Sequence, residues 1–125
     1  MPSGLIDTPL VRDYLRGDTR ARDALQRIAH RSLSVVSWLE LMAECPPALL
    51  ADTKAFLRSF ERLSVSEAIA DEALRLMLLH PGLARDRGLV WASATINQLP
   101  LLTCDPRGLP KADPRIVVAY IRDDQ

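Results

Sequence analysis

Residues 3–17 read SGLIDTPLVRDYLRG, and the pattern of apolar residues in this stretch changes at Asp7. The apolar run at residues 3–6 is typical of a short buried strand, and it ends at Asp7. From Thr8 onward the apolar residues recur instead at helical spacing, until Gly17 ends the helix. The stretch therefore predicts a strand that leads directly into a helix.

The same alternation continues along the chain. Further strands are predicted at residues 33–36, 63–65, 99–104 and 116–120. Further helices are predicted to begin at Asp18 or Thr19 and at Ser66, and to cover residues 38–44, 48–62 and 87–97. Strands that alternate with helices favour an α/β fold, in which an open and mostly parallel sheet carries helices on both faces.

The composition limits the class of protein. Of the 125 residues, 48% are hydrophobic and 26% are charged, so we expect one globular domain over residues 1–125 rather than a disordered chain. Lys plus Arg and Asp plus Glu each total 16, which excludes nucleic-acid binding driven by bulk positive charge. Two cysteines, the lack of a signal-peptide pattern and the lack of an apolar stretch of roughly 20 residues indicate a cytoplasmic protein with no membrane partner.

Three acidic residues are predicted to meet at one edge of this sheet. In an open α/β sheet, the working site forms beyond the carboxyl ends of the strands. Asp7 and Asp105 each follow a predicted strand directly. Glu40 lies one turn into the helix that follows the predicted strand at residues 33–36. Gathered carboxylates need a cation or protons to offset their repulsion, and oxygen ligands suit Mg²⁺ or Mn²⁺. Such an ion can activate water for displacement at a phosphoryl group.

Each of these acids also has a purely structural interpretation. Asp7 can cap the first helix, because Asp is a good N-cap and a proline in the first turn suits that position. Ser37 and Glu40 have the spacing of a capping box. Asp105 and Pro106 can form an ordinary turn. These alternatives stay open at the level of spacing alone.

Three blocks of the chain resemble those of a known family. They are LIDTPLVRDYLRG at residues 5–17, SVVSWLELMAE at residues 34–44 and QLPLLTCDPRGL at residues 98–109. In order and spacing they resemble the blocks of PIN-domain ribonucleases, and most of all the VapC-type toxins of toxin–antitoxin pairs. The resemblance implies a three-layer α/β/α sandwich around a parallel sheet and a metal-dependent endoribonuclease. It also implies an RNA substrate, Mg²⁺ or Mn²⁺ as cofactor, a cognate antitoxin and a homodimer.

The resemblance also assigns catalytic and metal-binding roles. Asp7 matches the family's first metal-binding acid, Glu40 the second and Asp105 the last. The third acid of the family begins the helix before the last acid, and Arg87 stands at that position here. Asp86, one residue earlier, is the acid that can replace it. If Arg87 points into the site instead, its charge competes with a metal ion.

Other side chains are expected to support the site or to contact RNA. They are Thr8, Ser37, Glu44, Thr103, Arg87, Arg107 and Lys111. The hydroxyl groups can fix the carboxylates by hydrogen bonds or merely cap helices, and Glu44 can be an outer metal ligand or a solvated side chain. The basic residues can grip phosphate or lie solvated on the surface.

Three functions follow from these observations. The first is a metal-dependent endoribonuclease that acts as a toxin. The alternative is a catalytically degenerate PIN domain that binds RNA or a protein, which is suggested by Arg87 and by Pro9 at a position where the family usually has Asn. The third is a flavodoxin-like domain with a phosphoacceptor Asp, although the chain lacks a glycine-rich phosphate loop.

Overall fold

The computed structural model describes residues 2–110 and 112–121, so Lys111 lies outside the described residues. The strands of its sheet are β1 (Ser3–Ile6), β2 (His30–Ser34), β3 (Glu61–Leu63), β4 (Leu101–Thr103) and β5 (Ile116–Val118). Their order is β3-β2-β1-β4-β5, and every neighbouring pair is parallel. The prediction of a mostly parallel sheet is therefore confirmed, and β1 lies at its centre.

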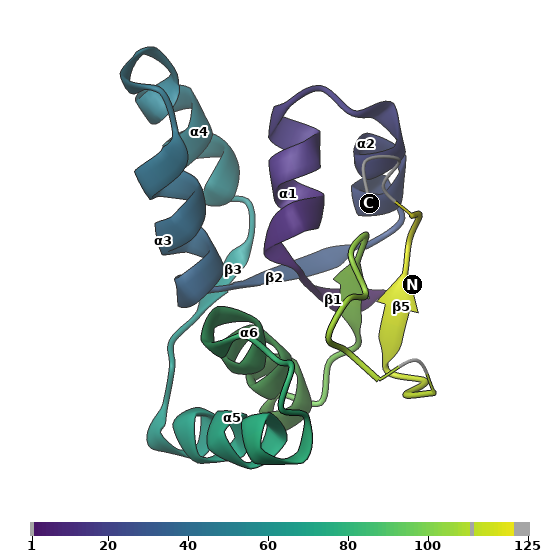
Figure 1. Cartoon of the computed structure of the whole chain (residues 1–125). Helices are drawn as coiled ribbons and strands as arrows, with labels where there is room; N and C mark the ends of the chain where they lie inside the picture. The colour runs from purple at the N-terminus through teal and green to yellow at the C-terminus, as the bar shows by residue number, and fades with distance from the viewer. Residues whose placement is uncertain (1, 111, 122–125) are drawn as a thin grey trace.

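The helices cover both faces of this sheet. They are α1 (Thr8–Leu15), α2 (Thr19–Gln26), α3 (Val35–Glu44), the short 3-10 helix η1 (Pro47–Leu49), α4 (Leu50–Leu57), α5 (Glu67–Leu79) and α6 (Arg85–Ile96). Helices α1 to α4 lie on one side of the sheet, and α5 and α6 lie on the other (Figure 1). This arrangement is the expected three-layer α/β/α sandwich.

The hydrophobic core is divided in two by the sheet. Because successive strand residues point to opposite faces, Ile6 and Leu102 pack with α1 to α4, whereas Leu5 and Leu101 pack with α5 and α6. All four side chains are buried. The alternation at these two central strands therefore anchors both helical layers to the same pair of strands.

The predicted strand at residues 33–36 is wrong at its second half. Val35 and Val36 begin α3 instead, because the Ser34 side chain caps the helix and accepts a hydrogen bond from the Val36 N–H at 3.1 Å. Ser37 therefore lies inside α3 and is not its cap. The capping box predicted for Ser37 and Glu40 is wrong for the same reason.

Several other boundaries also differ from the sequence expectations. The helix predicted over residues 48–62 ends at Leu57, and the chain is already a strand at Glu61. Helix α6 begins at Arg85, two residues before the predicted start, after the N-cap residue Ala84. Asp7 caps α1, which is one of the two roles considered for it, and Asp18 caps α2. None of the described helices is long and apolar enough to cross a membrane.

Candidate functional site

The four predicted acids line one cavity. Its volume is about 170 Å³, and it lies where β1 and β4 end and where α1 and α6 begin. The lining residues are Asp7, Thr8, Pro9, Arg12, Glu40, Asp86, Arg87, Val90 and Asp105. The structure thus brings together acids from four separate segments of the chain, at the edge of the sheet where the sequence placed them.

Asp7 is held by a dense set of hydrogen bonds. Its Oδ1 accepts from the Thr8 N–H at 2.9 Å, which is the cap of α1, and its Oδ2 accepts from Thr103 Oγ1 at 2.7 Å. Burial raises the pKa of the Asp7 carboxyl, and the charge of Arg87 and these hydrogen bonds oppose that rise. The capping role and the role in the cavity are therefore compatible, because each uses a different oxygen.

Arg87 reaches into the cavity from the first turn of α6. Its Nη2 donates to Asp7 Oδ2 at 2.6 Å and lies 3.4 Å from Thr103 Oγ1. Its Nη1 donates to the Arg107 carbonyl oxygen at 2.9 Å and lies 3.9 Å from Asp105 Oδ1. The Arg87 side chain is only 17% exposed. Its guanidinium therefore lies between the carboxylates of Asp7 and Asp105.

Asp105 has an arginine of its own. Arg107 Nε and Nη2 donate to its two oxygens, each at 2.7 Å, in a bidentate pair. These hydrogen bonds hold the pKa of the Asp105 carboxyl below its ordinary value, with burial opposing them. The Asp105 N–H also donates to Thr103 Oγ1 at 3.0 Å. Thr103 thus connects the first and last acids of the site.

Glu40 and Asp86 form the other side of the cavity. Burial, followed by the hydrogen bond and the negative charge of Asp86, raises the pKa of Glu40 to about 7. Thr8 Oγ1 lies 3.3 Å from Glu40 Oε1 and 2.7 Å from Ser37 Oγ, so it is within hydrogen-bonding distance of both. Thr8 therefore connects Ser37 of α3 to Glu40 of the cavity.

This arrangement does not fit a divalent metal ion. Within residues 2–110 and 112–121, no three His, Cys, Asp or Glu side chains are grouped so that they could hold one. Asp7 and Asp105 are bonded to arginines, and Glu40 and Asp86 interact with each other. A metal needs several oxygen ligands directed at one point, and the guanidinium of Arg87 lies between two of those available.

Glu44 lies outside the cavity. Its carboxylate accepts from Arg12 Nε at 2.6 Å and from Arg12 Nη2 at 3.2 Å, so it forms an ion pair at the rim. The expectation of an outer metal ligand therefore finds no support at Glu44. Arg12 itself lines the cavity, although it was not among the predicted site residues. Its position four residues after Thr8 puts both on one face of α1, and that spacing could have identified it.

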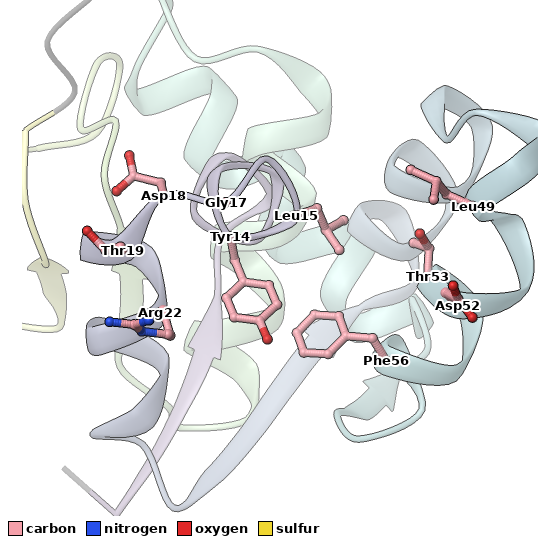
Figure 2. A pocket seen from close by; sticks show the side chains of 10 residues that line it. All are labelled: Tyr14, Leu15, Gly17, Asp18, Thr19, Arg22, Leu49, Asp52, Thr53 and Phe56. Carbon is pink, nitrogen blue, oxygen red and sulfur yellow. The ribbon is translucent and has the colours of Figure 1, made fainter.

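Two further hollows lie beside α1. Arg12 also lines a hollow of about 390 Å³ with Leu15, Glu44, Leu49 and Thr53 among its walls. Leu15, Leu49 and Thr53 line in turn a pocket of about 450 Å³, in which side chains of α1 and α2 face those of α4 (Figure 2). Each hollow shares lining residues with the next, so the cavity and the two hollows are neighbours along α1.

The stacked rings of Tyr14 and Phe56 form the floor of that last pocket. Their centroids are 4.5 Å apart, and both rings are visible in Figure 2 between the helices that carry them. Trp38 is half-buried against the same side of the core, with the guanidinium of Arg62 over its ring at 4.5 Å. The aromatic side chains near the site thus belong to the packing.

Comparisons with known proteins establish the fold. No family model and no curated protein matches the chain. A chain of a toxin–antitoxin complex from Klebsiella pneumoniae is 23% identical, with 95% of this chain and 99% of that chain covered and a TM-score of 0.88. The DNA-bound VapBC complex from Salmonella typhimurium gives 16% identity, 94% and 96% coverage and a TM-score of 0.76. A chain of VapBC2 from Rickettsia felis, bound to a DNA fragment from its promoter, is 13% identical, with 92% of this chain and 96% of that chain covered and a TM-score of 0.74. The chain therefore has the PIN-like α/β fold that it shares with chains of these toxin–antitoxin complexes.

Proposed function

We propose that this protein is the toxin subunit of a toxin–antitoxin pair and that it acts on RNA at the cavity between β1, β4, α3 and α6. One observation carries the proposal. Four acids from separate segments line a single cavity, in a chain whose fold matches chains of toxin–antitoxin complexes over nearly its whole length. The carboxyl edge of a parallel sheet is where such folds place their chemistry.

RNA is the proposed substrate because the cavity combines carboxylates with cations. Arg12 and Arg87 line it, and Arg107 lies at its rim with 70% of its side chain exposed. Guanidinium groups pair well with phosphate, and such contacts position a nucleic acid without reading its sequence. Cleavage by an endoribonuclease that uses Mg²⁺ or Mn²⁺ is the activity that the family resemblance implies. It requires Arg87 to leave Asp7, because the two groups are bonded at 2.6 Å.

An antitoxin is the proposed protein partner, and the hollows beside α1 support that assignment. Leu15 and Leu49 give both hollows apolar walls, and Arg12 lines the nearer hollow as well as the cavity. An extended or helical segment of a partner that fills these hollows would lie next to the acids. A second copy of the chain is a further proposed partner, because Leu74, Leu78 and Leu79 of α5 are exposed.

The proposed function is tested with two matched aspartates. Asp7→Asn replaces the site carboxylate, and Asp18→Asn makes the same change at the cap of α2, away from the cavity. Both variants keep their helix caps, since Asn caps a helix about as well as Asp. We expect Asp7→Asn to abolish cleavage of a mixed RNA substrate with Mn²⁺ present, and Asp18→Asn to leave it intact. Equal cleavage by both variants, in preparations free of other nucleases, would contradict the assignment.

The second candidate is a degenerate domain that binds RNA or a protein without cutting RNA. The ion pair between Arg87 and Asp7 favours this second candidate, because Arg87 occupies the carboxylate that would otherwise be available to a metal ion. In that case the wild type shows no cleavage under any metal condition. RNA retention in a filter-binding assay is then the same with Mn²⁺ and with a chelator, and it is unaffected by Asp7→Asn.

A further inference from the structure

We infer that Arg87 supplies from within the chain the positive charge that a metal ion would otherwise bring to this cavity. The side chain extends from the first turn of α6 to the carboxyl ends of β1 and β4. It occupies the space between Asp7 and Asp105, the two acids that follow the central strands of the sheet. The cavity is thus an acidic site with a built-in cation.

The contacts of Arg87 define a fixed position rather than a solvated side chain. Nη2 bonds Asp7, and Nη1 bonds the carbonyl oxygen of Arg107 at 2.9 Å. Thr103 Oγ1, in contact with the same Asp7 oxygen, lies beside the guanidinium. Three partners, after β1, at the end of β4 and in the turn that follows β4, therefore hold the guanidinium.

The electrostatics of the two acids require a cation or a proton at this point. Asp7 is 2% exposed and Asp105 is 7% exposed, so water screens neither carboxylate well. Two poorly solvated carboxylates at one strand edge repel each other unless a positive charge lies between them. Arg87 meets that requirement, and Arg107 adds a second charge on the outer side of Asp105. At these two carboxylates, a divalent ion would therefore find no unmet negative charge.

Arg87 and a divalent ion compete for the same oxygen atoms. Asp7 Oδ2 accepts from Arg87 at 2.6 Å, and the ion would need that lone pair as a ligand. Exchanging Arg87 for Asp removes the competing cation and adds a carboxylate near Asp7, Asp86 and Asp105. A single substitution should therefore convert the cavity into a site for a hard divalent cation.

The experiment is a titration of Mn²⁺ into the full chain, with neither RNA nor a protein partner present. Three proteins are compared by calorimetry and by the electron paramagnetic resonance signal of free Mn²⁺. They are the wild type, Arg87→Asp and Arg85→Asp, which makes the same charge change at an exposed position in the same helical turn. We expect Arg87→Asp to bind Mn²⁺ at least about tenfold more tightly than the wild type, and Arg85→Asp to match the wild type.

A second variant keeps the inference testable if Arg87→Asp does not fold. Arg87→Gln removes the charge, keeps hydrogen-bond donors near Asp7 and adds no new carboxylate. Circular dichroism identifies which variants are folded, and any folded Arg87 variant should gain thermal stability when Mn²⁺ is added, as expected for a ligand of the native state. The wild type should show no such gain.

Two outcomes would overturn the inference. One is a wild type that binds Mn²⁺ as tightly as Arg87→Asp, which would mean that Arg87 does not keep the ion out. The other is that folded Arg87→Asp and Arg87→Gln both fail to bind Mn²⁺. Because neither RNA nor an antitoxin is present, these results are independent of the proposed toxin function, which fails separately if Asp7→Asn retains full cleavage.

Discussion

Burial distinguishes the Arg87–Asp7 ion pair from other ion pairs with similar distances. Arg75 and Glu72 also pair closely, at 2.8 Å, but the Arg75 side chain is 58% exposed. Water screens that pair, so its contribution to stability is small. The carboxylate of Asp7 has no such access to water. Removing Arg87 would leave it buried and uncompensated, which costs far more than the loss of an exposed pair.

Glu40 interacts with the carboxyl group of Asp86 inside the cavity. Burial and the neighbouring Asp86 raise its pKa to about 7, well above its ordinary value of 4.5. The folded protein therefore holds a proton at Glu40 over a range of pH in which the unfolded chain has lost it. That difference makes a contribution to stability that depends on pH.

This contribution is fully present below about pH 4.5 and is lost as the pH rises toward about 7, because the folded state then loses its extra proton. Glu40→Gln, which resembles the protonated acid, should abolish this loss. Relative to the variant, we expect the wild type to become less stable by about 1 kcal/mol over that range, after allowance for the partial solvent screening of Glu40. Urea unfolding at a series of pH values measures the difference.

Glu67→Gln is the matched control, since Glu67 is an exposed residue at the start of α5, away from the cavity. It should show the same fall in stability between pH 4.5 and 7 as the wild type. A Glu40→Gln curve that runs parallel to the wild-type curve over this range would show that Glu40 does not hold the extra proton.

At the level of elements, the residues at which α3 and α6 begin determine which of their side chains reach the cavity. The β-branched pair Val35–Val36 favours a strand by local propensity, but the cap provided by Ser34 starts α3 there. Ser37 and Glu40, three residues apart, consequently lie on one helical face and meet Thr8. The start of α3 is thus set by a local cap that outweighs the strand propensity of the two valines.

The start of α6 explains why the sequence alone left open whether Asp86 or Arg87 points into the site. Its first turn begins at Arg85, two residues before the predicted helix, and the N-cap residue Ala84 offers no side-chain acceptor. In this register Arg87 and Val90 share a face and both line the cavity. The partners that hold Arg87 there are Asp7 and the Arg107 carbonyl, on segments that the local pattern does not connect.

The N-cap residue Ser34 should contribute to the stability of the protein through α3. Ser34→Ala should lower the free energy of unfolding by about 1 kcal/mol, because the Val36 N–H loses its acceptor inside the protein. Ser64→Ala, at an exposed position outside helices and strands, is the control and should change little. Chemical denaturation measures both. Equal stability of the two variants would mean that α3 does not depend on Ser34.

At the level of the whole molecule, the strand order explains why the acids could be predicted. With β1 between β2 and β4, the carboxyl ends of the central strands lie side by side, so residues that follow them meet. Asp7 and Asp105 each follow a strand, and the alternation of strands and helices is enough to infer a mostly parallel sheet, whereas the position of β4 beside β1 comes from the structure. The balance of charge inside the cavity depends instead on side-chain directions, which the order of elements does not specify.

Helix α5 exposes large apolar side chains on its surface. Leu74, Leu78 and Leu79 are 55%, 74% and 60% exposed, an unusual concentration of large apolar side chains on one helix. A second copy of the chain is the proposed partner for this face. If so, the wild type should sediment as a dimer at micromolar concentration, and Leu78→Lys should shift it to monomer, because burying the new charge opposes association. Val118→Lys, at a 41% exposed position on the edge strand β5, should leave the dimer intact. A monomeric wild type, or a Leu78→Lys variant that remains dimeric, would exclude this face of α5 as the contact between copies.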